Sequence, residues 1–172
     1  AVIVGNSSGY GGGIGIWQSD PVIEHTIVAG NSAALSGGGV FSEQSTPEVE
    51  YSSFWDNTPS DVYGMADPVG VDGNLSVDPE FLDATDPDPR YWDLHLSATS
   101  PLVDAGDPSV LDPDGSTLDI GVYGGPGAAG WDRDWDGYVE WWQPGEYDYG
   151  VYPGQGWDCD DQDAGVYPWN GC

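Results

Sequence analysis

Residues 21–31, which read PVIEHTIVAGN, recur 26 positions later as residues 47–57, which read PEVEYSSFWDN. A Gly triplet followed by an apolar residue recurs at the same offset, at 11–14 and 37–40. A period of roughly 20 to 50 residues is typical of a supersecondary unit stacked on copies of itself. Such a unit buries a continuous core only against its neighbours. The sequence therefore predicts stacked repeats over residues 1–65.

Each repeat combines short β-branched runs with Asn and Gly at fixed places. Runs of this length fit short strands. Ile23 and Val28 are five residues apart and cannot share one face of a flat strand, because side chains alternate between faces. A corner must therefore fall between them. Asn6, Asn31 and Asn57 recur once per repeat, and Asn tolerates the left-handed backbone of a tight corner. We expect their amides to form a hydrogen-bonded ladder and the Gly triplets to permit close approach between repeats.

The charge balance excludes some classes of function. The chain has 172 residues, enough for one domain and a small appendage, with 30 Asp or Glu, two Arg, no Lys and a formal net charge of −28. Such a field repels nucleic acid and anionic membranes and attracts cations. The 27 Gly and 14 Pro are typical of strands and turns. No apolar run approaches the length of a membrane span, so we expect neither nucleic-acid binding nor membrane insertion.

The repeat region resembles a known family. Residues 27–33 (IVAGNSA) and 37–40 (GGGV) are similar to the right-handed parallel β-helix repeats of secreted bacterial and archaeal proteins. Residues 73–81, 94–97, 100–107 and 119–125 resemble the closing coils of those proteins, which pair irregular strands over the last coil and cap its core. The resemblance implies an all-β, right-handed parallel β-helix with coils of 25–26 residues over 1–65 and closing coils and a cap over 66–130. It implies little about function, because the same scaffold hosts lyases, hydrolases, adhesins and structural proteins.

Residues 131–172 differ in character, with eleven Trp or Tyr and ten Asp or Glu. Residues 132–138 (DRDWDGY) have acidic residues at loop positions 1, 3 and 5, Gly at 6 and a backbone carbonyl at 7, the arrangement of a calcium loop. Gln143 stands at position 12, so this is not an EF-hand. Oxygen ligands favour Ca²⁺ over transition metals. A solvated acidic loop is the alternative.

This loop together with residues 158–168 resembles the Asp-rich metal-binding repeats near the C-termini of secreted bacterial proteins, which are related in style to thrombospondin type 3 repeats. The insert at 140–155 departs from that pattern and leaves the full ligand set open. The resemblance implies a Ca²⁺ site with candidate ligands Asp132, Asp134, Asp136, Tyr138, Asp158, Asp160, Asp161 and Asp163.

Three further features concern the compartment and partners of the chain. Cys159 and Cys172 lie 13 apart, as expected for a local disulfide formed in an oxidising, extracellular or cell-surface location; as soft metal ligands they would lack the additional Cys and His that zinc needs. Asn6 and Asn74 begin glycosylation sequons. The Trp residues of 131–172 have three interpretations: stacking on sugar rings, the core of a small calcium-stapled domain, or contact with a second subunit.

The repeat region offers little for catalysis. Lyases of this fold use Arg or Lys, and residues 1–89 contain neither. Glu24 and Glu50 occupy equivalent repeat positions, about 4.8 Å apart by strand spacing, which suits either a retaining hydrolase pair or a surface ladder. His25 aligns with Tyr51, which favours packing over general-base catalysis. For Arg90, beside Tyr91 and Trp92, we expect an ion pair or stacking.

We therefore expect a secreted, non-enzymatic structural protein that assembles with copies of itself. A β-helix that begins in mid-coil exposes strand edges, which are templates for another chain. Head-to-tail contact through this open end and the 131–172 segment does not close and yields a filament or surface layer, stabilised by Ca²⁺. The alternative is a C-terminal fragment of a larger carbohydrate-active enzyme, a polysaccharide lyase or glycoside hydrolase, or of an adhesin. Besides copies of the chain itself, extracellular polysaccharide is a candidate partner.

Overall fold

The structure is a computed structural model that describes residues 1–112 and 115–124, together with the backbone of 139–140 and 157–158. The chain divides into two units, Ala1–Gly125 and Pro126–Cys172. The described residues form strands and turns, with a single 3-10 turn at Pro89–Tyr91 and no α-helix. None of them belongs to a helix long and apolar enough to cross a membrane. The all-β prediction is confirmed.

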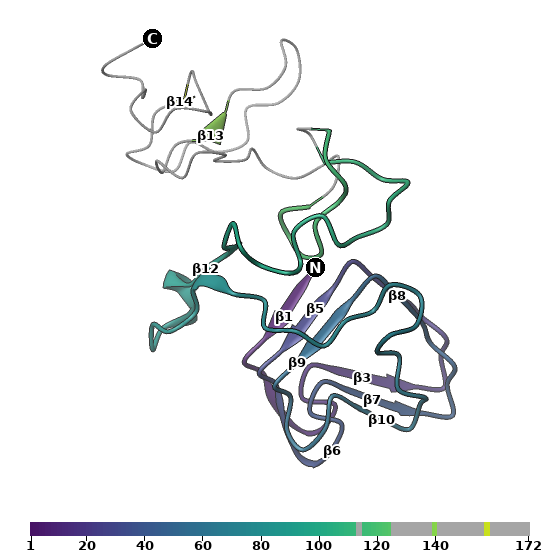
Figure 1. Ribbon diagram of the computed structural model, residues 1–172. Helices are drawn as coiled ribbons and strands as arrows, with labels where there is room; N and C mark the ends of the chain where they lie inside the picture. The colour runs from purple at the N-terminus through teal and green to yellow at the C-terminus, as the bar shows by residue number, and fades with distance from the viewer. Residues whose placement is uncertain (113–114, 125–138, 141–156, 159–172) are drawn as a thin grey trace. The chain divides into compact units, whose positions relative to one another are not determined.

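Three successive rows of chain, residues 1–25, 26–51 and 52–74, stack in parallel (Figure 1). The first row consists of β1 (Val2–Val4), β2 (Ser7–Tyr10), β3 (Ile14–Trp17) and β4 (Val22–Glu24). The second consists of β5 (Ile27–Ala29), β6 (Ser32–Ser36), β7 (Val40–Glu43) and β8 (Glu48–Glu50). The third contributes β9 (Ser53–Trp55) and β10 (Val62–Tyr63). Parallel pairing gives the sheets β1-β5-β9, β3-β7-β10, β2-β6 and β4-β8.

The register of these sheets reproduces the sequence period. Val2 pairs with Ile27, and Ile27 pairs with Ser53. Between β3 and β7, Ile14 pairs with Val40. These pairs place equivalent residues directly over one another at offsets of 25 or 26, whereas β10 pairs with β7 at an offset of 22. The predicted stacking of repeats is confirmed at the level of strand pairing.

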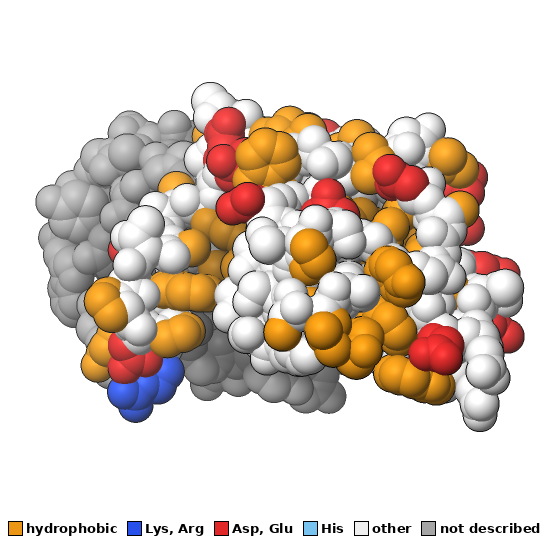
Figure 2. Space-filling view, turned by 90° about the horizontal axis from the view of Figure 1, so that it is seen from below, with side chains coloured by type: hydrophobic (Ala, Val, Ile, Leu, Met, Phe, Trp, Pro, Cys, Tyr) orange, Lys and Arg blue, Asp and Glu red, His pale blue; other side chains and the backbone are white. Residues whose placement is uncertain are grey.

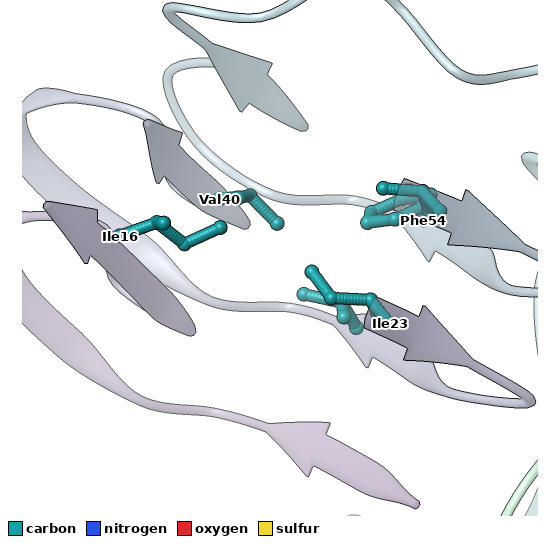
Figure 3. Close-up of a cluster of buried hydrophobic side chains, with 6 residues drawn as sticks. Ile16, Ile23, Val40 and Phe54 are labelled. Carbon is teal, nitrogen blue, oxygen red and sulfur yellow. The ribbon is translucent and has the colours of Figure 1, made fainter. Parts of the chain in front are cut away.

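The core between the sheets is built from the inward residues of facing strands. Figure 3 shows Ile16 and Val40 pointing towards Ile23 and Phe54. Val40 and Phe54 are completely buried. Because β4 and β5 belong to different sheets, a corner separates Ile23 from Val28 as predicted, and both side chains enter the same core. Burial of each such side chain stabilises the stack by about 1.5–3 kcal/mol.

The outer face of the β1-β5-β9 sheet is covered by the chain that follows the rows. Ile27 and Ala29 alternate with Val28 and therefore point outwards, yet both are buried. Their cover includes residues from the antiparallel pair β11 (Phe81–Asp83) and β12 (Asp93–Leu96) and from the loops after it. The apolar residues of this second cluster are Val2, Val4, Ile27, Ala29, Leu75, Val77, Phe81, Leu96, Leu102, Val103, Ala105 and Ile120.

The closing coils and cap expected over 66–130 stay a prediction, and the described contacts of residues 75–120 show where these residues pack. Leu75 adds a parallel bridge to Ser53 and so continues the stack for one residue pair. The following residues then pack against the side of the stack, on the outer face of β1-β5-β9. The physical reason is that Ile27 and the neighbouring outward residues form an apolar sheet face that must itself be covered.

The corner ladder is confirmed, with one correction. The Asn6 Nδ2 donates to Asn31 Oδ1 at 3.1 Å, and the Asn31 Nδ2 donates to Asn57 Oδ1 at 3.0 Å. The left-handed residue is the one before each Asn: Gly5, Gly30 and Asp56 have φ of 69°, 61° and 52°. The prediction that Asn itself adopts this conformation is therefore wrong. The amides serve the corner by hydrogen bonding between rows.

Candidate functional site

The outer face of the β3-β7-β10 sheet carries a cluster of aromatic rings. Ile14 and Ile16 contribute to the core, so the alternation of the strand directs Trp17 outwards. In the next row Val40 is the buried core residue, and its neighbour Phe41 lies on the outer face. Phe41 is in turn paired with Tyr63 of β10.

Four rings form this aromatic platform, which we define as Tyr10, Trp17, Phe41 and Tyr63. The Phe41 ring is at the centre, with its centroid 4.9 Å from that of Tyr10, 5.2 Å from that of Trp17 and 5.6 Å from that of Tyr63. The Phe41 and Tyr63 rings are stacked with nearly parallel planes, at 5°. Phe41 is only 5% exposed, whereas Tyr10, Trp17 and Tyr63 are 47%, 55% and 53% exposed. Three rings thus shield the fourth and themselves remain open to solvent.

A shallow hollow of about 650 Å³ lies over the platform. Its polar rim includes Glu43 and Gln44, and the Gln44 Oε1 accepts a hydrogen bond from Gln18 Nε2 at 2.9 Å. This bond links two rows and holds the rim amide in place. The full lining is Tyr10, Leu35, Ser36, Phe41, Ser42, Glu43, Gln44, Tyr63 and Gly64.

The surroundings of the platform are acidic. Residues 1–89 contain no Lys or Arg, and Figure 2 shows hydrophobic side chains gathered among carboxylates, with basic side chains confined to one edge of that view. Asp20, at the corner after Trp17, accepts hydrogen bonds from the Thr46 backbone N–H at 2.6 Å and the Thr46 hydroxyl at 3.0 Å, which hold its pKa below the usual value. Such carboxylates stay ionised at neutral pH, so the field around the rings is negative.

Arg90 lies in an ion pair, as expected from the sequence. Its guanidinium donates to both carboxylate oxygens of Asp88, and with the Arg90 backbone N–H it holds the pKa of Asp88 below the usual range. The Arg90 side chain is 81% exposed. The carboxylate of Asp88, two residues earlier in the chain, therefore neutralises the Arg90 charge.

The residues weighed for catalysis lie where the period predicts. Glu24 pairs in register with Glu50, and both are exposed. The rings of His25 and Tyr51 stack, with centroids 5.7 Å apart and planes at 12°. The Asp107 N–H donates to His25 Nε2 at 3.3 Å. His25 therefore joins a corner of the stack to the covering loop, which is the packing role predicted for it.

The two sequons have different environments. Asn6 is exposed, and its glycosylation stays a prediction. Asn74 is 1% exposed, and its Nδ2 donates to the Val49 carbonyl at 2.7 Å and the Val71 carbonyl at 2.8 Å. This buried nitrogen donates both its hydrogens, so the side chain joins two parts of a corner. Such an environment opposes a glycan on the folded chain, and glycosylation of Asn74 stays an untested prediction.

The predicted calcium site and disulfide lie outside the described residues. This holds for Asp132, Asp134, Asp136, Tyr138, Asp160, Asp161, Asp163, Cys159 and Cys172, and for the side chain of Asp158, of which β14 (Trp157–Asp158) describes the backbone. This strand pairs in parallel with β13 (Val139–Glu140). Within the described part of the chain, no three His, Cys, Asp or Glu side chains gather into a group able to hold a metal ion.

Comparisons with protein-family models, curated proteins and solved structures give no match for this chain. The chemistry of the site therefore follows from its own residues. Flat, half-exposed rings with a rim of amide and carboxylate oxygens bind apolar faces and accept hydrogen bonds. Within the described lining there is no Lys or Arg to stabilise developing negative charge.

The platform was not predicted from the sequence, because sugar-stacking rings were expected in residues 131–172. A signal was present: the alternation that places Ile14 and Ile16 in the core directs Trp17 outwards. The 26-residue offset also places Phe41 over Gly15. Tyr63 follows Phe41 by 22 residues rather than 26, so the period alone does not align it.

Proposed function

We propose that the chain contributes coils to a right-handed parallel β-helix in a secreted, non-enzymatic structural protein that assembles head-to-tail with copies of itself. The parallel rows at offsets of 25 and 26 support the β-helix. The exposed register pair Glu24–Glu50 and the stacking of His25 on Tyr51 support a structural role.

One observation carries the assembly proposal: two first-row positions, Ile3 and Ile14, are less buried than their partners in the second row. Ile3 pairs with Val28 and Ile14 pairs with Val40. Val28 and Val40 are completely buried, whereas Ile3 and Ile14 are only partly buried. A further row of the same kind would bury Ile3 and Ile14 to the same extent. Its apolar contact would add stabilisation of about 25 cal/mol per Å² removed from water.

The backbone of the first row is also available for pairing. Within the described residues β1 and β3 each pair on one side only. The Ile14 N–H donates to Gly39 O and the Gln18 N–H donates to Glu43 O, so Gly15, which alternates with these residues, directs its N–H away from β7. An edge of this kind accepts another strand. Pairing repeated by translation along the stack does not close and produces a filament.

Replacing Gly15 with Pro is expected to block assembly while leaving the fold intact. Proline removes only the outward N–H, and edge strands tolerate it. A Cβ at Gly15 meets nothing within 4 Å. In sedimentation velocity, we expect the wild-type chain to form species whose size rises with concentration, and Gly15→Pro to sediment as an 18.2 kDa monomer. Gly15→Ala, which adds the Cβ but keeps the N–H, is the matched control and should assemble like the wild type.

A wild-type chain that remains monomeric at all concentrations would contradict the assembly proposal. It would favour the second candidate, a segment of a larger β-helix carbohydrate-active enzyme or adhesin. The same edge supports that candidate. Preceding coils of one longer chain would pair with β1 and β3 in the same way that a second copy would. Equal loss of assembly in Gly15→Ala and Gly15→Pro would mean that the side of the sheet, not its edge, makes the contact.

We infer Ca²⁺ as the stabilising ion from the Asp-rich sequence of residues 132–163. The carboxylates present there are the hard oxygen ligands that Ca²⁺ takes. An ion bound by the folded state raises the melting temperature by mass action. We expect EGTA to lower the melting temperature of the full chain by several degrees and added Ca²⁺ to restore it, with Mg²⁺ as the control ion. An unchanged melting temperature would contradict a structural calcium site.

A further inference from the structure

We propose that the aromatic platform binds a neutral linear polysaccharide. The platform lies on the outer face of β3-β7-β10, on side chains rather than on the strand edge that the assembly proposal uses. Binding there is independent of head-to-tail assembly, so either proposal can fail alone.

The first argument is the arrangement of the rings along the stack. Tyr10, Phe41 and Tyr63 come from the first, second and third rows, and their centroid separations are 4.9 and 5.6 Å. Phe41 is buried at the centre, so the rings open to solvent are Tyr10 and Trp17 from the first row and Tyr63 from the third. The C–H groups on one face of a pyranose ring form an apolar surface that packs on an aromatic ring. Exposed rings from two different rows offer such contacts to more than one sugar, which suits a linear polymer.

The second argument is the cost of leaving these side chains exposed. Tyr63 and Leu35, which both line the hollow, are 53% and 60% exposed. Trp17, which contacts Phe41 but does not line the hollow, is 55% exposed. A contiguous exposed apolar patch marks a binding surface more often than a scattered one does. Tyr and Trp suit such a surface because a large rigid ring carries a polar tip.

The third argument is the polar rim. Glu43, Gln44 and Ser36 border the hollow. Their carboxylate, amide and hydroxyl groups supply both hydrogen-bond donors and acceptors. Sugar hydroxyls are donors and acceptors as well, and so are matched to this rim. The Gln18–Gln44 hydrogen bond fixes one rim amide before a ligand arrives, which lowers the entropy lost on binding.

The fourth argument is charge, which selects the class of polysaccharide. A chain with a formal net charge of −28, with no Lys or Arg in residues 1–89, repels polyuronates, sulfated glycans and nucleic acid. A protein partner fits less well, because nine residues line the hollow and a stable protein interface uses about 20–30 residues a side. An uncharged polysaccharide is not repelled by the negative charge and does not need the larger interface that a protein partner uses.

Affinity electrophoresis of the full chain tests the proposal, with hydroxyethylcellulose and galactomannan as neutral probes and polygalacturonate as the anionic probe. We expect retardation by at least one neutral probe and none by polygalacturonate. Trp17→Ala and Tyr63→Ala are each expected to weaken binding about tenfold, which corresponds to about 1.4 kcal/mol per ring. Tyr91→Ala is the matched control, because Tyr91 is 70% exposed and lies outside the platform, and it should bind like the wild type.

Several outcomes would overturn the proposal. Absence of retardation by both neutral probes would do so, and so would equal weakening by Tyr91→Ala and Tyr63→Ala. Retardation by polygalacturonate alone would contradict the charge argument. If Tyr63→Ala leaves glycan binding unchanged but abolishes self-association in sedimentation, the platform is a contact between copies of the chain. Urea unfolding of each variant separates loss of binding from loss of fold.

Discussion

Gly38→Ala is expected to lower the free energy of unfolding by about 3 kcal/mol, at the upper end of the usual cost of overpacking. A Cβ on Gly38 would lie 2.5 Å from the backbone N and C of Thr58, and closer still to its carbonyl oxygen. Thr58 is fixed between rows, since its N–H donates to Asn31 O at 2.9 Å and its carbonyl accepts from the Ala33 N–H at 2.8 Å. The added methyl group must therefore push two rows apart.

Gly9→Ala is the matched control for this prediction. Gly9 lies in β2, and a Cβ there meets nothing within 4 Å. Its replacement should change stability by less than about 0.5 kcal/mol, with a small gain from the reduced entropy of the unfolded chain. Urea unfolding followed by circular dichroism measures both variants. Equal stability of Gly38→Ala and Gly9→Ala would show that the rows are not in close contact at this corner.

Asn31→Ala is expected to cost about 3 kcal/mol, because several buried groups lose their partners together. Asn31 is 1% exposed. Its Oδ1 accepts from the Asn6 backbone N–H at 2.9 Å, and its Nδ2 donates to the Ile3 carbonyl at 2.9 Å and to Asn57 Oδ1 at 3.0 Å. One side chain thus joins all three rows. Its removal leaves the buried Asn57 amide oxygen with fewer donors.

Two further variants separate the ladder from simple loss of volume. Asn31→Asp keeps the shape but replaces the donor with an acceptor that faces the Asn57 Oδ1, and should destabilise the chain as much as Asn31→Ala. Asn6→Ala removes the exposed end of the ladder and should cost about 1 kcal/mol or less. The measurement is the midpoint of urea unfolding, which reports stability when the dependence of the unfolding free energy on urea concentration is the same for all variants. If Asn31→Asp retained wild-type stability, the donor bonds of Nδ2 would not stabilise the corner.

Much of the stack was predictable because stacked repeats place equivalent residues over one another. The 26-residue offset alone predicted the Glu24–Glu50 register and the His25–Tyr51 stack, and both are present. It also predicted the amide ladder through Asn31. It did not identify the corner conformation, because Asp56 and its equivalents adopt the left-handed backbone to orient the following Asn.

The candidate site was less predictable, because it depends on contacts between residues without a common offset. Tyr10 lies in β2 and Phe41 in β7, so their ring contact joins two different sheets. Tyr63 aligns with Phe41 only because the third row is shorter. The burial of Asn74 similarly arises from a late loop that returns to the Val49 carbonyl.

The order of the residues was sufficient for the period, the parallel register and the acidic character of the surface, because each depends on spacing or on counting charges. The cover over the outer face of β1-β5-β9 and the rings around Phe41 required the folded arrangement. Which apolar residues remain exposed depends on where segments distant in sequence come to lie. For this reason Ile27 is buried by the late loops, while Trp17 remains available to a ligand.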